Sequence, residues 1–378
     1  MPALLTEITE VATALGASGA PDLDTALEQP PASLVNVAGS VIEVLRQAHR
    51  DTAFQKDFAR AWENGRAFFE SDDGLRGRVP LTIEWKGPHR APGYDNVPVD
   101  LRIDHVYLVS CKYQSRILAN SSPANLFHRR LMERTVESVG SSWYETVVPE
   151  HYSAFYSAIR HELGESQLPV EPRELTDAHK HVIRESCSRA WPEALREPWN
   201  ELSFAIARES ARRWNLNIDT PARQEEMLWR LLRLGPAPYF VLGSSVNEPM
   251  RLRIGTPWDW KQHFNLEDFK IEAIPGGQPI VAWSALISQR SDGRLRKVEG
   301  HVEVRWAHGR FSTVEAKVYL DTPHAFVPGY FAFNPKDQVE PPPVIEDGES
   351  YGQLALWSSV DDESVDDKDE MGAGSERY

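Results

Sequence analysis

The sequence predicts a mixed α/β protein: a sheet flanked by helices, a large helical insertion, an antiparallel β-meander and a disordered acidic tail. Three observations support this fold class. Residues 100–103 and 106–113 are two strand-like runs on either side of Asp104-His105, which predicts a β-hairpin. Residues 176–234 show a helical pattern that only prolines interrupt. After Gly235, short runs rich in β-branched and aromatic residues replace that pattern and are typical of strands.

The elements before the hairpin are predicted to be mainly helical. Apolar residues at helical spacing predict helices over residues 4–15, 34–48 and 53–70, with a proline-rich linker between the first two. Residues 81–85 are expected to form a first strand. Asp104-His105 is the expected turn of the hairpin, between a strand at 100–103 and a strand at 106–113.

The elements after the hairpin are predicted from capping and turn residues. Ser122-Pro123 provides an N-cap and a first-turn proline for a short helix, Pro149 opens another, and Gly235 is a candidate C-terminal cap for the long helical block. The expected strands that follow span residues 239–242, 251–254, 279–289, 297–306 and 311–321.

These elements suggest four consecutive regions. Residues 1–35 are a helix and linker, and residues 36–260 are an α/β domain whose helical insertion covers about 150–234. Residues 261–340 are a β-rich domain, and residues 341–378 are predicted to be disordered because they are rich in proline and acids.

Charge and composition exclude some functions. The net charge is −15, but from Pro341 onward the chain carries 11 acidic and two basic residues. The other 45 acids and 39 bases leave a net charge of −6, which excludes a broadly basic, nonspecific nucleic-acid binder. No run is apolar and long enough for a membrane span, and no signal-peptide pattern is present, so we expect a cytoplasmic protein without a membrane partner.

The hairpin carries the residues that most clearly indicate chemistry. Asp100 lies on its first strand, and Ser110 and Lys112 share one face of its second strand because side chains alternate across a strand. A carboxylate can hold a divalent metal ion, and a nearby lysine can steady a hydroxide or a phosphate oxygen. The other possibility is an ion pair between Asp100 and Lys112 that only supports the hairpin.

This pattern resembles the PD-(D/E)xK motif of restriction-endonuclease-like nucleases, because Asp100 is followed after a short gap by x-x-Lys112. Pro98 stands two residues before Asp100. This chain departs from the family pattern because Ser110 stands where the family has Asp or Glu. The order of helix, three strands and helix around the motif is also what the resemblance requires. A further strand is needed after that helix, and residues 239–242 are the candidate.

The resemblance implies a mixed sheet and cleavage of phosphodiester bonds with Mg²⁺ or Mn²⁺. Asp100 would bind the metal, Lys112 would position the attacking water or stabilise developing charge, and Ser110 would contribute its hydroxyl or a bound water. Glu84 is the first candidate for the missing acid, since the strand that carries it is expected beside Asp100. Asp104 is the second candidate. Glu63 and Glu70, on the preceding helix, remain open.

Basic residues near the hairpin are candidates for contacts with a phosphate backbone. These are Arg102 and Arg116, with Arg129, Arg130 and Arg134 further along. For the last three the alternative is a solvated helix face, on which Glu133 and Glu137 pair with the arginines at helical spacing.

Two other patterns have structural interpretations. Glu303 and Glu315-Ala316-Lys317 also match an acid-x-lysine pattern, but opposite charges on adjacent strands predict a cross-strand ladder. His179 and His181 lie two residues apart in a helical pattern, so they are a poor metal pair.

The sequence therefore supports two functional hypotheses. The first is a metal-dependent nuclease-like protein that acts on DNA in restriction, defence or repair. The second is a non-catalytic binding or assembly protein on a degenerate nuclease scaffold, with a protein as the partner.

Overall fold

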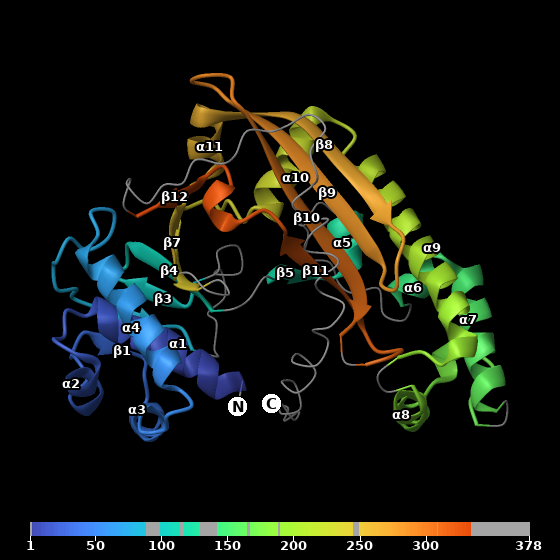
Figure 1. Ribbon diagram of the computed structural model, residues 1–378, viewed down its shortest axis with the longest axis horizontal. Helices are drawn as coiled ribbons and strands as arrows, with labels where there is room; N and C mark the ends of the chain where they lie inside the picture. The colour runs from blue at the N-terminus through green and yellow to red at the C-terminus, as the bar shows by residue number, and fades with distance from the viewer. Residues whose placement is uncertain are drawn as a thin grey trace.

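A computed structural model describes residues 2–87, 99–113, 117–128, 142–164, 167–187, 190–244, 249–307 and 309–333. It confirms a mixed α/β architecture with two sheets, one seven-stranded and mixed, the other five-stranded and antiparallel. Figure 1 shows the first sheet with the helices of residues 2–70 on the left and the second sheet with the longer helices on the right. The predicted acidic tail, residues 341–378, lies outside the described residues.

The seven-stranded sheet has the order β1-β2-β3-β4-β6-β7-β12. Strands β2, β3 and β4 are antiparallel neighbours, whereas β6 lies parallel to β4. The strand predicted at residues 239–242 therefore pairs directly with the second strand of the hairpin. The strands are β1 (Leu34–Val35), β2 (Ile83–Trp85), β3 (Leu101–Ile103), β4 (Tyr107–Tyr113), β6 (Tyr239–Ser244), β7 (Pro249–Ile254) and β12 (Tyr330–Ala332).

Helices at the N-terminus cover one face of this sheet. Residues 1–35 are not a separate helix and linker, because α1 packs along α4 in the same buried cluster as Leu101 and Val109 of the hairpin. The predicted helix at 34–48 begins later, since Leu34 and Val35 pair with β2 as a parallel strand. The helices are α1 (Pro2–Ala17), α2 (Leu23–Glu28), α3 (Gly39–His49) and α4 (Gln55–Glu70).

Helices α1 and α4 touch through their backbones. A Cβ atom at Gly65 would collide with the carbonyl oxygen of Thr13, and a Cβ at Gly16 would collide with that of Trp62. Both positions therefore require glycine, because backbone atoms of a packed helix cannot move aside as a flexible side chain can.

A buried polar network joins these helices to the sheet. Asn64 is 1% exposed, and its amide donates to the Gly243 carbonyl (2.8 Å) and to the Tyr113 hydroxyl (3.2 Å). Its carbonyl oxygen accepts from Nε of Arg251 at 2.9 Å, and Thr13 bonds the same Tyr113 hydroxyl at 2.8 Å. The network connects α1, α4, β4, β6 and β7, so it fixes their relative positions.

The second sheet has the order β5-β11-β10-β9-β8 and packs against α9. The predicted strands at 279–289, 297–306 and 311–321 form its centre. Its edge strands were not predicted to belong to it: β5 directly follows the hairpin, and β8 precedes the meander. The strands are β5 (Ile117–Ser121), β8 (Phe264–Ile274), β9 (Ile280–Gln289), β10 (Leu295–Trp306) and β11 (Val314–Leu320).

The predicted helical block is present as separate helices. Ser122 caps α5 by accepting from the Asn125 amide, as expected. The last helix of the block ends at Leu231, and Arg233, with a φ of 56°, takes the left-handed conformation that was expected at Gly235. The helices are α5 (Pro123–Phe127), α6 (Trp143–Val147), α7 (Pro149–Leu163), α8 (Asp177–Ser186), α9 (Glu193–Asn217), α10 (Pro221–Leu231) and α11 (Pro257–His263), with short 3₁₀ turns η1 (Pro172–Glu174) and η2 (His324–Phe326).

A second core runs from the other face of the first sheet to the five-stranded sheet. Val241 and Leu252 belong to the same buried cluster as Trp260, Val302 and Val304. The chain also crosses between the sheets, since β5 pairs with β11 and β12 returns to pair with β7. The packing therefore does not follow the predicted boundary between residues 260 and 261.

We predict that Gly65→Ala lowers the free energy of unfolding by about 3 kcal/mol, because the new methyl group forces α4 away from α1. Denaturant unfolding would measure the loss. Gly39→Ala is the matched control, since nothing lies within 4 Å of a Cβ there and alanine favours the first turn of α3. Equal stability of the two variants would contradict the proposed helix contact.

Candidate functional site

The hairpin forms as predicted and closes with a tight turn. Asp104 and His105 have positive φ values of 50° and 59°, and the Val106 amide donates to the Ile103 carbonyl at 3.1 Å. Two consecutive residues with positive φ are typical of the type I′ turn, whose twist matches that of the strands. The register pairs Ile103 with Tyr107 and Leu101 with Val109, and the Asp100 amide donates to the Val109 carbonyl at 2.9 Å. Asp100 therefore lies beside the residues of β4 that follow Val109.

Asp100 lies beside Ser110, as the motif resemblance requires. One carboxylate oxygen of Asp100 accepts from the Cys111 amide at 2.7 Å and from the Ser110 hydroxyl at 3.2 Å. Asp100 is 8% exposed and Ser110 is fully buried. These contacts hold the carboxylate against β4 and leave Ser110 in the position where a second acid would stand.

Lys112 follows Ser110 by two residues and so projects from the same face of β4. It is half-buried, and Gly243 of β6 lies opposite it. A Cβ at Gly243 would collide with the Lys112 carbonyl oxygen, so β6 needs glycine at this point. The structure thus brings Asp100 and Ser110 into contact at the end of the hairpin away from its turn, and Lys112 follows two residues further along β4.

Glu84 lies on the same face but is engaged by other side chains. Arg102 reaches one of its oxygens through Nε (2.6 Å) and a terminal nitrogen (2.5 Å), and Lys86 reaches the other at 3.0 Å. The Asn36 amide also donates to that second oxygen, at 3.3 Å. Burial alone would raise the pKa of Glu84, but the bonds from Lys86 and Arg102 outweigh it and lower the pKa. Metal binding by Glu84 would have to replace these ion pairs.

Asp104 lies at the opposite end of the hairpin from Asp100, about 13 Å away at about 3.3 Å per residue. Its carboxylate accepts from the amides of Leu81 (2.7 Å) and Thr82 (3.0 Å) and pairs with Arg78 at 2.6 Å. Burial raises its pKa, but the Thr82 amide and Arg78 lower it further. The structure does not bring Asp104 to Asp100, so the two do not form one metal site.

The remaining predicted residues have other surroundings or are not described. Glu63 and Glu70 are exposed on α4, which packs on the other face of the sheet. Arg102 belongs to the Glu84 ion pairs. Arg116, Arg129, Arg130 and Arg134, like Pro98, lie outside the described residues.

Sequence reasoning missed Lys86. Its amide donates to the Asp100 carbonyl at 2.9 Å, so Lys86 is the residue opposite Asp100 on the β2 side. The signal was present in the sequence, because Glu84 and Lys86 are two residues apart and must share a face of one strand.

The described residues supply few ligands for a metal ion. No group of three or more His, Cys, Asp or Glu side chains among them is arranged to hold one. Of the residues predicted to bind metal, Asp100 is the one whose position fits the motif. Mg²⁺ commonly uses one or two carboxylates together with water and phosphate oxygens. At this position the described residues offer the Asp100 carboxylate, to which the buried Ser110 hydroxyl donates.

The two other sequence patterns are structural. Glu303 lies opposite Lys317 across β10 and β11, and Arg305 lies opposite Glu315, which is the expected ladder. His179 accepts from the Thr176 amide at 3.2 Å in the capping box that begins α8.

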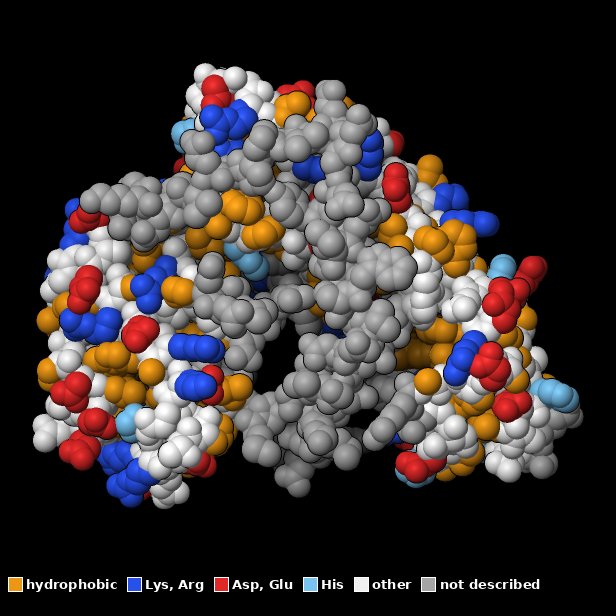
Figure 2. Space-filling view, in the orientation of Figure 1, with side chains coloured by type: hydrophobic (Ala, Val, Ile, Leu, Met, Phe, Trp, Pro, Cys, Tyr) orange, Lys and Arg blue, Asp and Glu red, His pale blue; other side chains and the backbone are white. Residues whose placement is uncertain are grey.

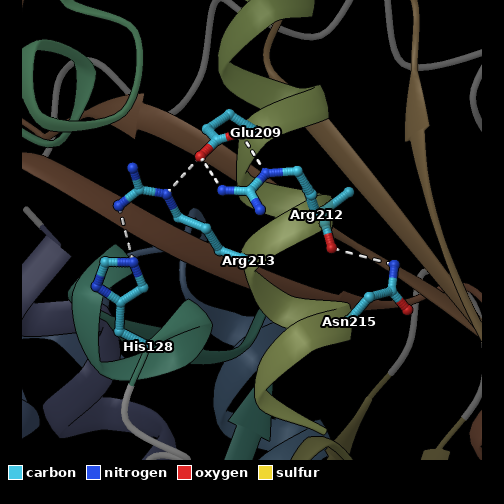
Figure 3. A network of polar contacts seen from close by, with 6 residues as sticks. His128, Glu209, Arg212, Arg213 and Asn215 are labelled. Carbon is cyan, nitrogen blue, oxygen red and sulfur yellow. Dashed lines mark hydrogen bonds and ion pairs between the residues drawn. The ribbon is translucent and has the colours of Figure 1, made fainter. Parts of the chain in front are cut away.

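A separate polar network joins α9 to α5. Arg212 and Arg213 both bind Glu209, and Arg213 also contacts Nε2 of His128 at 2.9 Å (Figure 3). Arg213 further lies over the Trp143 ring, 5.7 Å from its centroid. The hydrogen bond from Arg212 is the main cause that lowers the pKa of Glu209 to about 2. Burial acts to raise this pKa, and the bond from Arg213 lowers it further. The network connects the C-terminal half of α9 to His128 at the end of α5.

Comparisons with known proteins do not add to this description. No protein-family model, no curated protein and no solved structure matches this chain. In the part of the chain that the structure describes, no helix has the length and apolar character needed to cross a membrane.

We predict that the Glu209 network stabilises the protein most at neutral pH. The carboxylate has a lower pKa folded than unfolded, so its stabilisation is present above about pH 4.5 and is lost as the pH falls toward 2. Glu209→Gln should therefore lower the free energy of unfolding by about 2 kcal/mol at pH 7 and by much less near pH 2. Urea unfolding across this range measures the difference, and a loss independent of pH would contradict the electrostatic cause.

Proposed function

We propose that this protein is a nuclease-like, metal-dependent phosphodiester hydrolase that acts on DNA in restriction, defence or repair. We further propose that its seven-stranded sheet is a restriction-endonuclease-like core with a degenerate motif. The observation that carries the proposal is the contact of Asp100 with Ser110 and the Cys111 amide, two residues before Lys112. The antiparallel β2-β3-β4 strands with β6 parallel to β4 support it as well.

The roles of the residues follow from their charges and positions. The Asp100 carboxylate would hold the metal together with the Ser110 hydroxyl, water and a substrate phosphate. A bound Mg²⁺ or Mn²⁺ lowers the pKa of a coordinated water and neutralises phosphate charge. The Lys112 ammonium would orient the attacking water and stabilise the charge that develops on the phosphate oxygens.

The surface charge suits a localised site. In the view of Figure 2, acidic and basic side chains are interspersed over the part of the molecule formed by α1–α4, and no single basic band covers it. A protein without such a band contacts nucleic acid through a local group of cations, which limits the number of phosphates that it neutralises.

A second candidate function is a non-catalytic binding protein on the same scaffold. The ion pairs of Glu84 and the distance of Asp104 favour it, because they leave Asp100 as the one predicted carboxylate at the motif. On this alternative, Asp100 serves to cap the Cys111 amide, and the face of the sheet binds a partner without cutting it. The two candidate functions differ in their requirements: the hydrolase needs a metal ion and the Asp100 charge for cleavage, whereas the binding protein needs neither for binding.

The first test is cleavage of supercoiled DNA, single-stranded DNA and RNA with Mg²⁺ or Mn²⁺. We expect Asp100→Asn and Lys112→Met each to reduce the rate at least 100-fold, because each removes a charge used in the transition state. Asparagine keeps an acceptor for the Cys111 amide, so folding is preserved. Asp268→Asn and Lys270→Met are matched controls on the exposed edge strand β8.

Cutting that needs metal and both residues supports the hydrolase. If folded wild-type protein cuts none of the substrates at any metal concentration, the hydrolase proposal fails and the binding protein is favoured.

A second prediction uses stability and does not depend on activity. Ser110→Asp restores the second acid of the motif and places two carboxylates side by side, so without metal it should lower the melting temperature. Mn²⁺ should then raise the melting temperature of Ser110→Asp more than that of wild type, since binding at 100 times Kd adds about 2.7 kcal/mol. Ser110→Asn is the control of equal size, and the same Mn²⁺ response in all three proteins would exclude a metal site at Asp100.

A further inference from the structure

We propose that His301, oriented by Asp321, is the general base of a second site, which cleaves RNA on the polar face of the five-stranded sheet. This inference goes beyond the proposed function, because it uses residues of β10 and β11 and does not need a metal ion. Asp321 has a positioning role, since it acts through His301.

The five-stranded sheet has one apolar face and one polar face. Val302 of β10 and Val318 of β11 belong to the buried core that also contains residues of α9. Because side chains alternate across a strand, His301, Tyr319 and Asp321 lie on the opposite face. His301 and Tyr319 are partners in the register of β10 and β11, so the sheet itself places the two rings side by side.

Asp321 fixes the orientation of the imidazole ring. Nδ1 of His301 lies 2.9 Å from both carboxylate oxygens of Asp321. The ring also stacks on that of Tyr319, with 4.7 Å between the centroids and an angle of 10°. The side chains of His301 and Asp321 are 14% and 11% exposed. Because an ionised carboxylate only accepts hydrogen bonds, Nδ1 carries the proton, and Nε2 of the neutral ring presents a lone pair.

A histidine held in this way is suited to proton transfer. Among the described residues its hydrogen-bond partner is Asp321, through Nδ1, and no serine hydroxyl or cysteine thiol is bonded to Nε2. The proton that Nε2 accepts therefore comes from a substrate or from water. Ala282 lies opposite His301 on β9, so a small side chain borders the ring on that side.

Cations further along the same face indicate a substrate that contains phosphate. The next pair on this face is Glu303 with Lys317, and the pair after it is Arg305 with Glu315. A general base is sufficient for RNA, because each RNA phosphate has a 2′-hydroxyl beside it that becomes the nucleophile when its proton is removed. RNA is therefore the substrate class that this face fits, and DNA, which lacks the 2′-hydroxyl, is excluded from the reaction.

The reaction is a transesterification within the RNA strand. Nε2 of His301 takes the proton of the 2′-hydroxyl while the 2′-oxygen forms a bond to phosphorus. The bond between phosphorus and the 5′-oxygen breaks, and that oxygen takes a proton from water, while His301 returns its own proton to the solvent. The products are a 2′,3′-cyclic phosphate and a 5′-hydroxyl. Lys317 neutralises charge that develops on the phosphate oxygens.

The first test is cleavage of a single-stranded RNA oligonucleotide in EDTA, with the same sequence carrying 2′-O-methyl groups as the comparison. We expect the unmodified strand alone to be cut, with a 2′,3′-cyclic phosphate detected by mass spectrometry. His301→Gln should reduce the rate about 100-fold or more, and Asp321→Asn about 10-fold or more. His263→Gln and Asp268→Asn, at exposed positions, are the matched controls and should keep the wild-type rate.

A second measurement observes the imidazole directly and does not depend on activity. The ¹⁵N NMR signals of the His301 ring, assigned by their loss in His301→Gln, report which nitrogen carries the proton. At a pH where the ring is neutral, we expect the proton on Nδ1 in the wild-type protein and a shift toward Nε2 in Asp321→Asn.

A purely structural role for His301 would give different results. If RNA is not cut in EDTA, if His301→Gln cuts as fast as wild type, or if the wild-type ring carries its proton on Nε2, the inference is overturned. The proposed function fails or succeeds separately. Asp100→Asn should abolish metal-dependent cutting of DNA and leave the cleavage of RNA in EDTA unchanged.

Discussion

The backbone contact between α1 and α4, at Gly16 and Gly65, determines which face of the seven-stranded sheet is covered. Because no side chain separates the two helices there, both reach the sheet, and Asn64 and Thr13 can bond Tyr113. The apolar residues of β2, β3 and β4 turn toward these helices. Strand alternation then directs Glu84 of β2 and Arg102 of β3 to the opposite face, where the two side chains pair.

The opposite face changes character along the sheet. At β6 and β7 it is apolar and belongs to the second core, whereas at β2, β3 and β4 it carries charges that are partly buried. Half-buried charges at the border of a core are costly unless they are paired, which accounts for the ion pairs of Glu84. The same pairing limits the chemistry, because a carboxylate that binds two cations is a poor metal ligand.

The two sheets are connected through exchanged strands. The chain leaves the hairpin to form β5 at the edge of the second sheet, and it returns after the meander to form β12 at the edge of the first. One edge strand of each sheet is therefore supplied by a segment that is adjacent in sequence to strands of the other sheet. The second core also touches both sheets, so the face of the first sheet that α1–α4 do not cover is buried together with the second sheet.

Sequence alone determined the features that depend on neighbours along the chain. The type I′ turn at Asp104-His105, the cap at Ser122 and the periodic helices follow from local sterics and hydrogen bonds, as does the shared face of Asp100, Ser110 and Lys112. Residues 268–273 of β8 also alternate between polar and apolar side chains, as expected of a strand with one buried face.

Tertiary structure alone decided the pairing of β1 with β2 and the strand exchange. It likewise decided the capture of Glu84 by two cations and the place of Lys86 beside Asp100. These depend on registers between strands that are far apart in sequence, and local patterns carry no information about which strand pairs with which.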